Sequence, residues 1–288
     1  MRIAEIFRSL QGEGRLTGTP SLFVRASGCN LYCRFCDTPY ASWTPEGDDL
    51  SVAEILARVE AVSKNSNRGL FQFSFDENGT VPFPKTMTKG SGVEKGSELF
   101  IGENSSDPFS APFSAPINSS DPFFRHVVLT GGEPLLWADL VPLAAALRKR
   151  GLHITIETAG TRYLPVACDL MSISPKLSNS SPTAREQAAW LACHERNRHA
   201  PEVIRRLRAE YDCQFKFVVD SLADCQEVLD YLATFPEIDR RQVWLMPQGT
   251  DAAALAEKAA WLEPYCAAQG VSFCPRRHIE WFGPGRGK

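Results

Sequence analysis

The sequence predicts an α/β fold made of parallel strand–helix units. Segments rich in Val, Ile and Phe alternate along the chain with segments of helical periodicity, which is typical of parallel sheets whose strands are joined by helices. The 288 residues, 43% of them hydrophobic and 23% charged, are enough for one large domain with a sizeable core. In barrels or partial barrels of this class, the chemistry lies in loops after the carboxyl ends of the strands.

The individual elements follow from this alternation. The predicted strands lie at residues 3–7, 21–26, 126–130, 153–157, 170–174, 214–219, 242–246 and 271–274. The predicted helices lie at residues 52–62, 138–149, 184–194, 201–210, 222–234 and 252–269. Two of these helices begin with a capping-box pattern, Ser51 with Glu54 and Ser221 with Asp224.

One long segment breaks the alternation, from about residue 63 to residue 124. It is rich in Ser, Asn, Gly, Pro and Phe, and the sequence N-S-S-D-P-F at 104–109 recurs at 118–123. Such segments bury too little apolar surface to offset the entropy lost on ordering. We therefore predict a single domain over residues 1–288, interrupted by a disordered low-complexity insertion at about 63–124. Its phenylalanines leave a partner-docking role open.

The bulk properties exclude several classes of protein. The net charge is −3 and no run is rich in Lys or Arg, so nothing calls for a nucleic-acid or membrane partner. The first residues have no long apolar run and no small-residue cleavage site, and no stretch approaches the ~18 apolar residues of a membrane span. Nine cysteines, of which only three are close together, indicate reduced thiols rather than a disulfide framework. We expect a cytoplasmic protein.

Three cysteines directly follow a predicted strand, with C-x3-C-x2-C spacing: Cys29, Cys33 and Cys36. Iron–sulfur clusters are usually held by four thiolates, and three would leave one iron open to a substrate or cofactor. A structural zinc site needs four ligands, and the next cysteine along the chain is far away. Burial as small hydrophobic side chains suits the scattered cysteines instead: Cys168, Cys193, Cys213, Cys225, Cys266 and Cys274. We therefore predict a four-iron, four-sulfur cluster on the first three.

This cysteine motif, with Phe35 before its last cysteine, resembles that of the radical S-adenosylmethionine superfamily. The segment L-T-G-G-E-P at 129–134 resembles the superfamily's GGEP motif, where the loop meets the amino group of S-adenosylmethionine. Paired glycines allow a ligand to approach the backbone closely, although GGEP alone could be a strand-to-helix turn. The resemblance implies a partial (β/α)6-type radical SAM barrel with an amino-terminal strand and loop extension. It also implies S-adenosylmethionine as cofactor and an external one-electron donor such as flavodoxin or ferredoxin.

A narrower resemblance, to the 7-carboxy-7-deazaguanine synthase family, covers almost the whole chain outside the insertion. It rests on S-L-Q-G-E-G at 9–14, Arg25, C-D-T at 36–38, S-P-K at 174–176, M-P-Q-G at 246–249 and the tail from Arg277. It implies a homodimeric carbon–nitrogen lyase in queuosine and 7-deazapurine biosynthesis. The reaction contracts the ring of 6-carboxy-5,6,7,8-tetrahydropterin to 7-carboxy-7-deazaguanine and releases ammonia, with the radical chemistry supplied by S-adenosylmethionine rather than by a catalytic side chain.

The same resemblance implies roles for individual residues. The implied substrate contacts are Leu10, Gln11, Gly12, Arg25, Thr130 and His278. The implied S-adenosylmethionine contacts are Phe35, Cys36, Asp37, Gly132, Ser174, Pro175, Lys176, Met246, Pro247, Gln248 and Gly249. Arg25 would pair with the substrate carboxylate, which suits a planar bidentate donor. Thr38 would bind Mg²⁺, whose other ligands would come from substrate and water.

Each of these residues also has a simpler interpretation. Arg25 could form an ordinary surface ion pair, Thr38 could cap a turn, and His278 could be a hydrogen-bonded residue in a carboxyl-terminal loop. The segment at 174–176 could be a strand end with a solvated lysine. The insertion is longer than the family's usual connection, and the P-G pair at 284–285 is a less familiar variant of the tail. Two other functions also stay open, a radical activase that places a glycyl radical on a partner protein and a non-enzymatic structural metal-binding module.

Overall fold

The computed structural model describes residues 1–64, 125–183, 188–283 and 285–287. These residues form one nine-stranded sheet in the order β3-β1-β2-β4-β5-β6-β7-β8-β9. The strands are β1 (Arg2–Leu10), β2 (Pro20–Ala26), β3 (Asp48–Asp49), β4 (His126–Gly131), β5 (His153–Thr158), β6 (Leu170–Ile173), β7 (Cys213–Val219), β8 (Val243–Pro247) and β9 (Ser272–Phe273). From β2 to β9 the pairing is parallel, while β1 and β3 add antiparallel strands at one edge.

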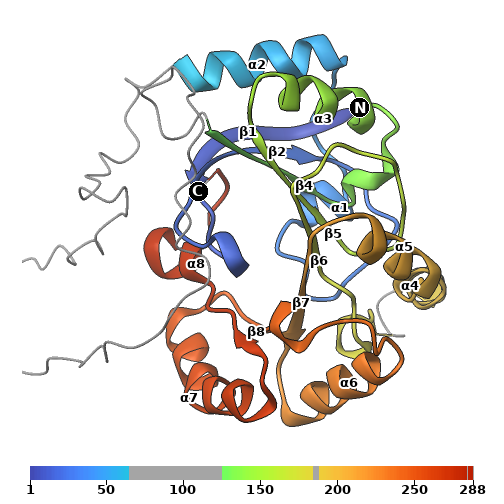
Figure 1. Ribbon diagram of the computed structural model, residues 1–288, viewed down its shortest axis with the longest axis vertical. Helices are drawn as coiled ribbons and strands as arrows, with labels where there is room; N and C mark the ends of the chain where they lie inside the picture. The colour runs from blue at the N-terminus through green and yellow to red at the C-terminus, as the bar shows by residue number, and fades with distance from the viewer. Residues whose placement is uncertain (65–124, 184–187, 284, 288) are drawn as a thin grey trace, which may run out of the picture.

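The described residues also form eight helices. They are α1 (Pro39–Ser42), α2 (Val52–Lys64), α3 (Leu140–Lys149), α4 (Ala188–Arg198), α5 (Pro201–Glu210), α6 (Leu222–Ala233), α7 (Ala252–Gln269) and α8 (Arg277–Phe282). The sheet curves as an open arc with α3, α5, α6 and α7 on its convex side (Figure 1). Leu129, Ile154 and Phe215 are fully buried in the core between helices and sheet, as expected where parallel strands are covered.

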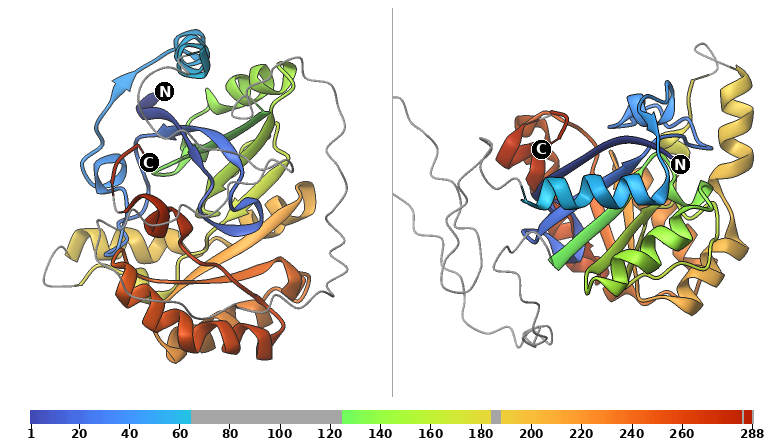
Figure 2. Two further views of the ribbon diagram at one scale, coloured as in Figure 1. Left: turned by 90° about the vertical axis from the view of Figure 1, so that its left-hand side faces the viewer. Right: turned by 90° about the horizontal axis from the view of Figure 1, so that it is seen from above.

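The open side of the arc is crossed by the loop that follows β1. The amide of Gly14 contacts Cys274 Sγ at 3.2 Å, and the amide of Arg15 donates to Gln214 Oε1 at 2.8 Å. The amide of Arg277, at the start of α8, donates to Gly12 O at 3.0 Å. The loop from one edge of the sheet therefore reaches β7 and the segment after β9, and α8 lies beside it (Figures 1 and 2). The predicted partial barrel with an amino-terminal strand and loop extension is confirmed, and it is not closed.

The predicted elements agree with the structure apart from their ends and a few short additions. All eight predicted strands and both capping boxes are present, with Ser51 N donating to Glu54 Oε2 at 2.8 Å. The helix predicted at 184–194 corresponds to α4, which ends four residues later, and residues 184–187 lie outside the described part. Three elements were not predicted: α1, β3 and α8. His278 lies in α8, so the simpler alternative for this residue, a position in a carboxyl-terminal loop, does not hold.

The predicted low-complexity insertion at about 63–124 falls almost entirely on residues 65–124, which lie outside the described part of the chain. Within the described residues, no helix combines the length and the apolar character needed to cross a membrane.

Candidate active site

A cavity of about 280 Å³ opens on the concave face of the sheet. Its wall includes side chains from successive parallel strands, among them Thr130 on β4, Glu157 on β5, Ser172 on β6 and Lys216 on β7. The loop after β1 and the start of α8 complete the wall. This is where a sheet of this class is expected to carry its chemistry.

The cysteine loop, residues 29–36, brings all three predicted cluster ligands to this cavity. Cys29, Cys33 and Cys36 line it, and Cys36 Sγ lies 3.0 Å from Ser42 Oγ. Burial raises the pKa of Cys29 to about 12 and that of Cys33 to about 11, so the metal-free thiols hold their protons. Across the described residues, no three His, Cys, Asp or Glu side chains form a site for a single metal ion. Three thiols on one loop fit a polynuclear cluster, because each thiol then binds a different iron.

Side chains of helix α4 contact the cysteine loop and support its backbone. The amide of Tyr32 donates to Nδ1 of the fully buried His194 at 3.2 Å, and His194 Nε2 lies 3.0 Å from Ser180 Oγ. The Tyr32 ring stacks on Trp190 with centroids 4.1 Å apart, and Asn197 donates to a backbone carbonyl of the loop at 3.2 Å. These contacts fix the loop backbone between its cysteines.

The GGEP loop approaches the chain just before Cys29. A Cβ on Gly132 would lie 2.2 Å from Gly28 O, so only glycine fits this close approach. Glu133 is fully buried, where its carboxylate accepts hydrogen bonds from Thr158 Oγ1 at 2.8 Å and Ala159 N at 2.9 Å. Desolvation raises its pKa. Gly132 therefore faces the cavity, whereas the Glu133 carboxylate ties the loop to the end of β5 instead of facing a ligand amine.

The predicted S-adenosylmethionine contacts divide into two groups. Those that line the cavity are Phe35, Cys36, Asp37, Gly132, Ser174, Lys176, Met246 and Gln248. Those that do not are Pro175, Pro247 and Gly249. Lys176 Nζ donates to the backbone oxygen and to Oγ of Ser174, at 2.8 Å each, so this lysine is folded back on the strand end rather than freely solvated.

The predicted substrate contacts all line the same cavity: Leu10, Gln11, Gly12, Arg25, Thr130 and His278. Arg25 and Thr130 are register partners on β2 and β4. Gln11 Nε2 and Thr130 Oγ1 both donate to the Glu157 carboxylate, at 3.1 and 2.8 Å. A Cβ on Gly12 would come within 2.5 Å of His278 Nδ1, which brings the two ends of the chain into contact here.

Thr38 sits at the amino-terminal cap of α1, but its side chain makes no capping hydrogen bond. Its hydroxyl lines the cavity and lies 3.9 Å from Cys36 Sγ. The hydroxyl is therefore not used to cap the turn before Pro39, which was its simpler interpretation.

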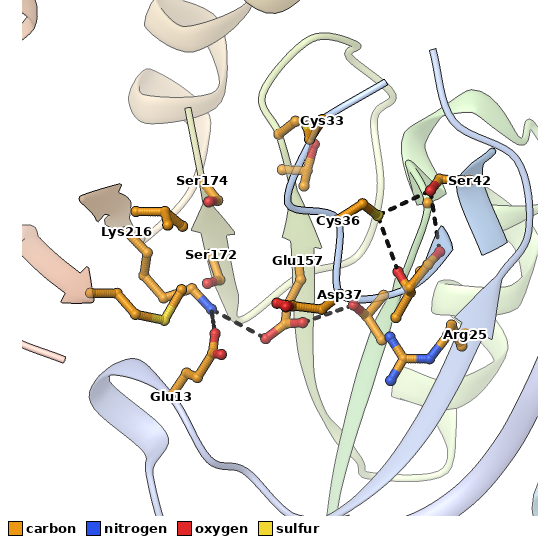
Figure 3. Close-up of a pocket in the computed structure, with 18 of the residues that line it drawn as sticks. Glu13, Arg25, Cys33, Cys36, Asp37, Ser42, Glu157, Ser172, Ser174 and Lys216 are labelled. Carbon is orange, nitrogen blue, oxygen red and sulfur yellow. Dashed lines mark hydrogen bonds and ion pairs between the residues drawn. The ribbon is translucent and has the colours of Figure 1, made fainter. Parts of the chain in front are cut away.

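A buried charge network, Glu13, Glu157, Lys216 and Arg276, forms the floor of the cavity and was not predicted. Lys216, with a side chain 5% exposed, has Nζ 3.0 Å from Glu13 Oε2 and 3.5 Å from Glu157 Oε1 (Figure 3). Arg276 Nε lies 3.5 Å from Glu13 Oε1, and its terminal nitrogens bind Asp37. Burial would lower the pKa of Lys216 and raise those of the two glutamates, but their mutual attraction outweighs it and keeps all three charged. A lysine inside the apolar strand C-Q-F-K-F-V-V was the available signal.

Comparison with known proteins gives relatives over nearly the whole chain. No family model matches it. A 7-carboxy-7-deazaguanine synthase from Rhodopirellula baltica is 37% identical over 286 residues, which cover 99% of this chain and 88% of that protein. Another, from Halobacterium salinarum, is 34% identical over 96% of this chain and 88% of its own length. A crystal structure of QueE from Escherichia coli shares the fold, with a TM-score of 0.56 and 21% identity over 96% of this chain and 94% of that chain.

Proposed function

The chain belongs to the 7-carboxy-7-deazaguanine synthase family, and we propose that its cavity carries out the radical ring contraction of 6-carboxy-5,6,7,8-tetrahydropterin. The observation that carries this proposal is that one cavity is lined by the three cysteines, the GGEP loop and Arg25. A radical source and an anchor for a substrate carboxylate would thus face each other. A glycyl-radical activase or a structural metal module is not favoured, because the matched relatives are synthases.

One part of the cavity would bind the cofactors and the other part would bind the substrate. Cys29, Cys33 and Cys36 would hold the cluster, which when bound supplies the electron that cleaves S-adenosylmethionine to its radical. Gly132 and the ends of β6 and β8 would receive the rest of that cofactor, with Ser174, Lys176, Met246 and Gln248 facing it. The neighbouring Pro175, Pro247 and Gly249 would act by shaping these strand ends.

On the substrate side, Arg25 would bind the substrate carboxylate through its planar guanidinium group. Gln11 and Thr130 already converge on Glu157, so this acceptor is oriented before a ligand arrives. Leu10, Gly12 and His278 would close the cavity from the crossing loop and α8. Their contribution is placement and exclusion of water from the radical.

We propose Thr38 as the protein ligand of Mg²⁺. The hydroxyl at this position makes no capping hydrogen bond and belongs to a residue that lines the cavity, so it fits a hard oxygen ligand for an ion that often keeps non-protein ligands. The test measures the Mg²⁺ dependence of turnover in Thr38→Ala. The matched control is Thr234→Ala, which changes a threonine at the carboxyl-terminal end of α6, outside the cavity. Loss of the dependence in the first variant alone supports the assignment, and an unchanged dependence contradicts it.

The proposed activity is tested on anaerobically reconstituted protein. We expect about four iron and four sulfide per chain, reductive cleavage of S-adenosylmethionine, and conversion of the carboxylated pterin with release of ammonia. Cys29→Ala should abolish all of these, whereas Cys168→Ala, which changes another half-buried free cysteine outside the cavity, should keep them. Cofactor cleavage without any pterin conversion would contradict the proposed substrate, and a colourless zinc protein would contradict the radical chemistry.

We further propose a flavodoxin or ferredoxin as one-electron donor, a homodimeric assembly and a cytoplasmic location. The location is supported by the nine free cysteines and by the need of the cluster for reduced thiols.

A further inference from the structure

Arg25 is held by a carboxylate that lies outside the cavity and by an aromatic ring in the cavity wall. Its side chain is 18% exposed and lines the cavity, while Nε donates to Glu5 Oε1 at 2.6 Å. The guanidinium carbon lies 5.6 Å from the ring centre of Phe7, which itself stacks on Phe23 at 5.1 Å. Because Nε makes the contact with Glu5, the edge formed by the two terminal nitrogens is the one that can bind a carboxylate bidentately.

Glu5 is in turn shared with a second residue. The Tyr40 hydroxyl donates to the same oxygen, Glu5 Oε1, at 2.7 Å. Glu5 does not line the cavity that holds Arg25 but a separate pocket, which Glu46 and Arg286 also line. The ion pair of Glu5 and Arg25 therefore separates the two pockets.

The carboxyl-terminal tail contacts both Tyr40 and the surroundings of Glu5. The guanidinium carbon of Arg286 lies 3.5 Å from the ring centre of Tyr40, and its Nη2 lies 2.9 Å from Glu46 Oε2. A Cβ on Gly287 would lie 4.0 Å from Glu5 Oε2, so the tail backbone runs beside that carboxylate.

We propose that Glu5, Tyr40 and Arg286 form a clasp through which the carboxyl-terminal tail positions Arg25 for the substrate carboxylate. The three are positioning residues, since none of them lines the cavity. The inference rests on the proposed function, because it takes Arg25 as the anchor of the carboxylate. In this proposal the carboxyl-terminal tail affects substrate binding through Tyr40 and Glu5, and not by direct contact with the substrate.

The clasp acts by geometry and not by charge. A carboxylate beside Arg25 opposes the binding of a second carboxylate, so the negative charge of Glu5 cannot be its contribution to substrate binding. Both hydrogen bonds to Glu5 end on one oxygen, Oε1. A glutamine offers one such oxygen without the charge, so Glu5→Gln should keep the clasp while Glu5→Ala removes it.

The test uses the reconstituted holoenzyme and two pterins. Glu5→Ala should raise KM for the carboxylated substrate by roughly 10-fold and change kcat by less than about 3-fold, because the anchor is misplaced rather than removed. Glu5→Gln should recover most of that loss. Calorimetric binding of tetrahydropterin, which lacks the carboxylate, should be the same in the wild type and both variants.

The tail is tested by Tyr40→Phe and Arg286→Ala, each expected to raise KM by about 3-fold. The matched control is Arg148→Ala, whose ion pair with Asp169 at 2.7 Å is similarly exposed, at 46% for the arginine against 51% for Arg286. This control should keep the wild-type KM. Should Glu5→Ala not fold, Tyr40→Phe decides the question, since it removes one hydroxyl and leaves the ring under Arg286.

Three outcomes overturn the clasp. The first is an unchanged KM in Glu5→Ala or Tyr40→Phe, and the second is an equal loss of affinity for tetrahydropterin. The third is a failure of Glu5→Gln to recover the KM, which contradicts the geometric account. The proposed function fails separately, if the wild type does not convert the carboxylated pterin or if Arg25→Ala keeps the wild-type KM. The clasp alone would be rejected if the wild type converts the substrate and Arg25→Ala raises KM, while Glu5→Ala leaves KM unchanged.

Discussion

Replacing Lys216 by methionine should strongly destabilise the protein. The change keeps most of the side-chain volume but removes the cation that lies 3.0 Å from Glu13 and 3.5 Å from Glu157. Glu13 keeps Arg276, with Nε at 3.5 Å, whereas Glu157 keeps only neutral hydrogen-bond donors among its described partners. Removing one partner of a buried ion pair typically costs about 3–5 kcal/mol. We therefore expect a loss of that size at pH 8 and a fall in Tm of roughly 10 °C.

The pH dependence of this loss identifies its cause. Burial alone would raise the pKa of Glu157, but Lys216 outweighs it and holds the pKa below 4.5. Without Lys216 the folded-state pKa should rise above that of the unfolded chain, so the folded protein binds a proton more tightly. The deficit should then grow as pH rises through and above about 4.5 and be smallest in acid.

Urea unfolding of wild type and Lys216→Met at pH 5 and pH 8 measures the effect. The control is Arg58→Met, which removes an exposed ion pair with Asp48 at 2.9 Å and should cost less than about 1 kcal/mol. Adding Glu157→Gln to Lys216→Met should restore more than about 1 kcal/mol at pH 8. A loss below 1 kcal/mol, or the same loss at both pH values, would refute the account of an uncompensated buried carboxylate.

Three further predictions concern single contacts. Gly132→Ala should abolish cofactor cleavage measured on the reconstituted protein, since its Cβ would lie 2.2 Å from Gly28 O and displace the GGEP loop. His194→Ala should speed cluster loss, followed by visible absorbance, because the buried ring no longer accepts from Tyr32 N; an unchanged rate would show that the cysteine loop does not need this support. Burial lowers the pKa of His126 from 6.5 to about 3. Below pH 6.5 this imidazole is therefore protonated in the unfolded chain but stays neutral in the folded protein. The contribution of His126 should therefore lower the free energy of unfolding by roughly 1.4 kcal/mol for each unit that the pH falls from 6.5 to 4. His126→Gln should remove this slope in urea titrations.

Local sequence signals predicted the elements and half of the site. Strand and helix periodicity is a property of short segments, so the eight strands and the two capping boxes could be placed from sequence alone. The cysteine spacing and the GGEP segment are also local, and both lie at the cavity. The elements missed are short: α1 has four residues, β3 has two and α8 has six, so none of them shows a long apolar periodicity. Such elements depend on tertiary contacts, for instance the bond from Arg277 N to Gly12 O.

The charges in the cavity could not be predicted because their partners are far apart in sequence. Glu13 and Lys216 are separated by 203 residues, and Asp37 and Arg276 by 239. Nothing near Glu133 indicates that its carboxylate turns toward Thr158 on β5 rather than toward the cavity.

The same long-range contacts explain why the two ends of the chain are needed for one site. The loop after β1 carries Glu13, and the segment after β9 carries Arg276, so the ion pair between them links the crossing loop to the last strand. Arg276 also binds Asp37, directly after the cysteine loop, and Arg286 reaches Tyr40 on α1. The carboxyl-terminal segment therefore contacts the first 40 residues on both sides of the cavity. A sheet that does not close by strand pairing is instead spanned by charged side chains. Because Glu13 and Arg276 are largely buried and paired, their contact also determines which ionised groups a ligand meets in the cavity.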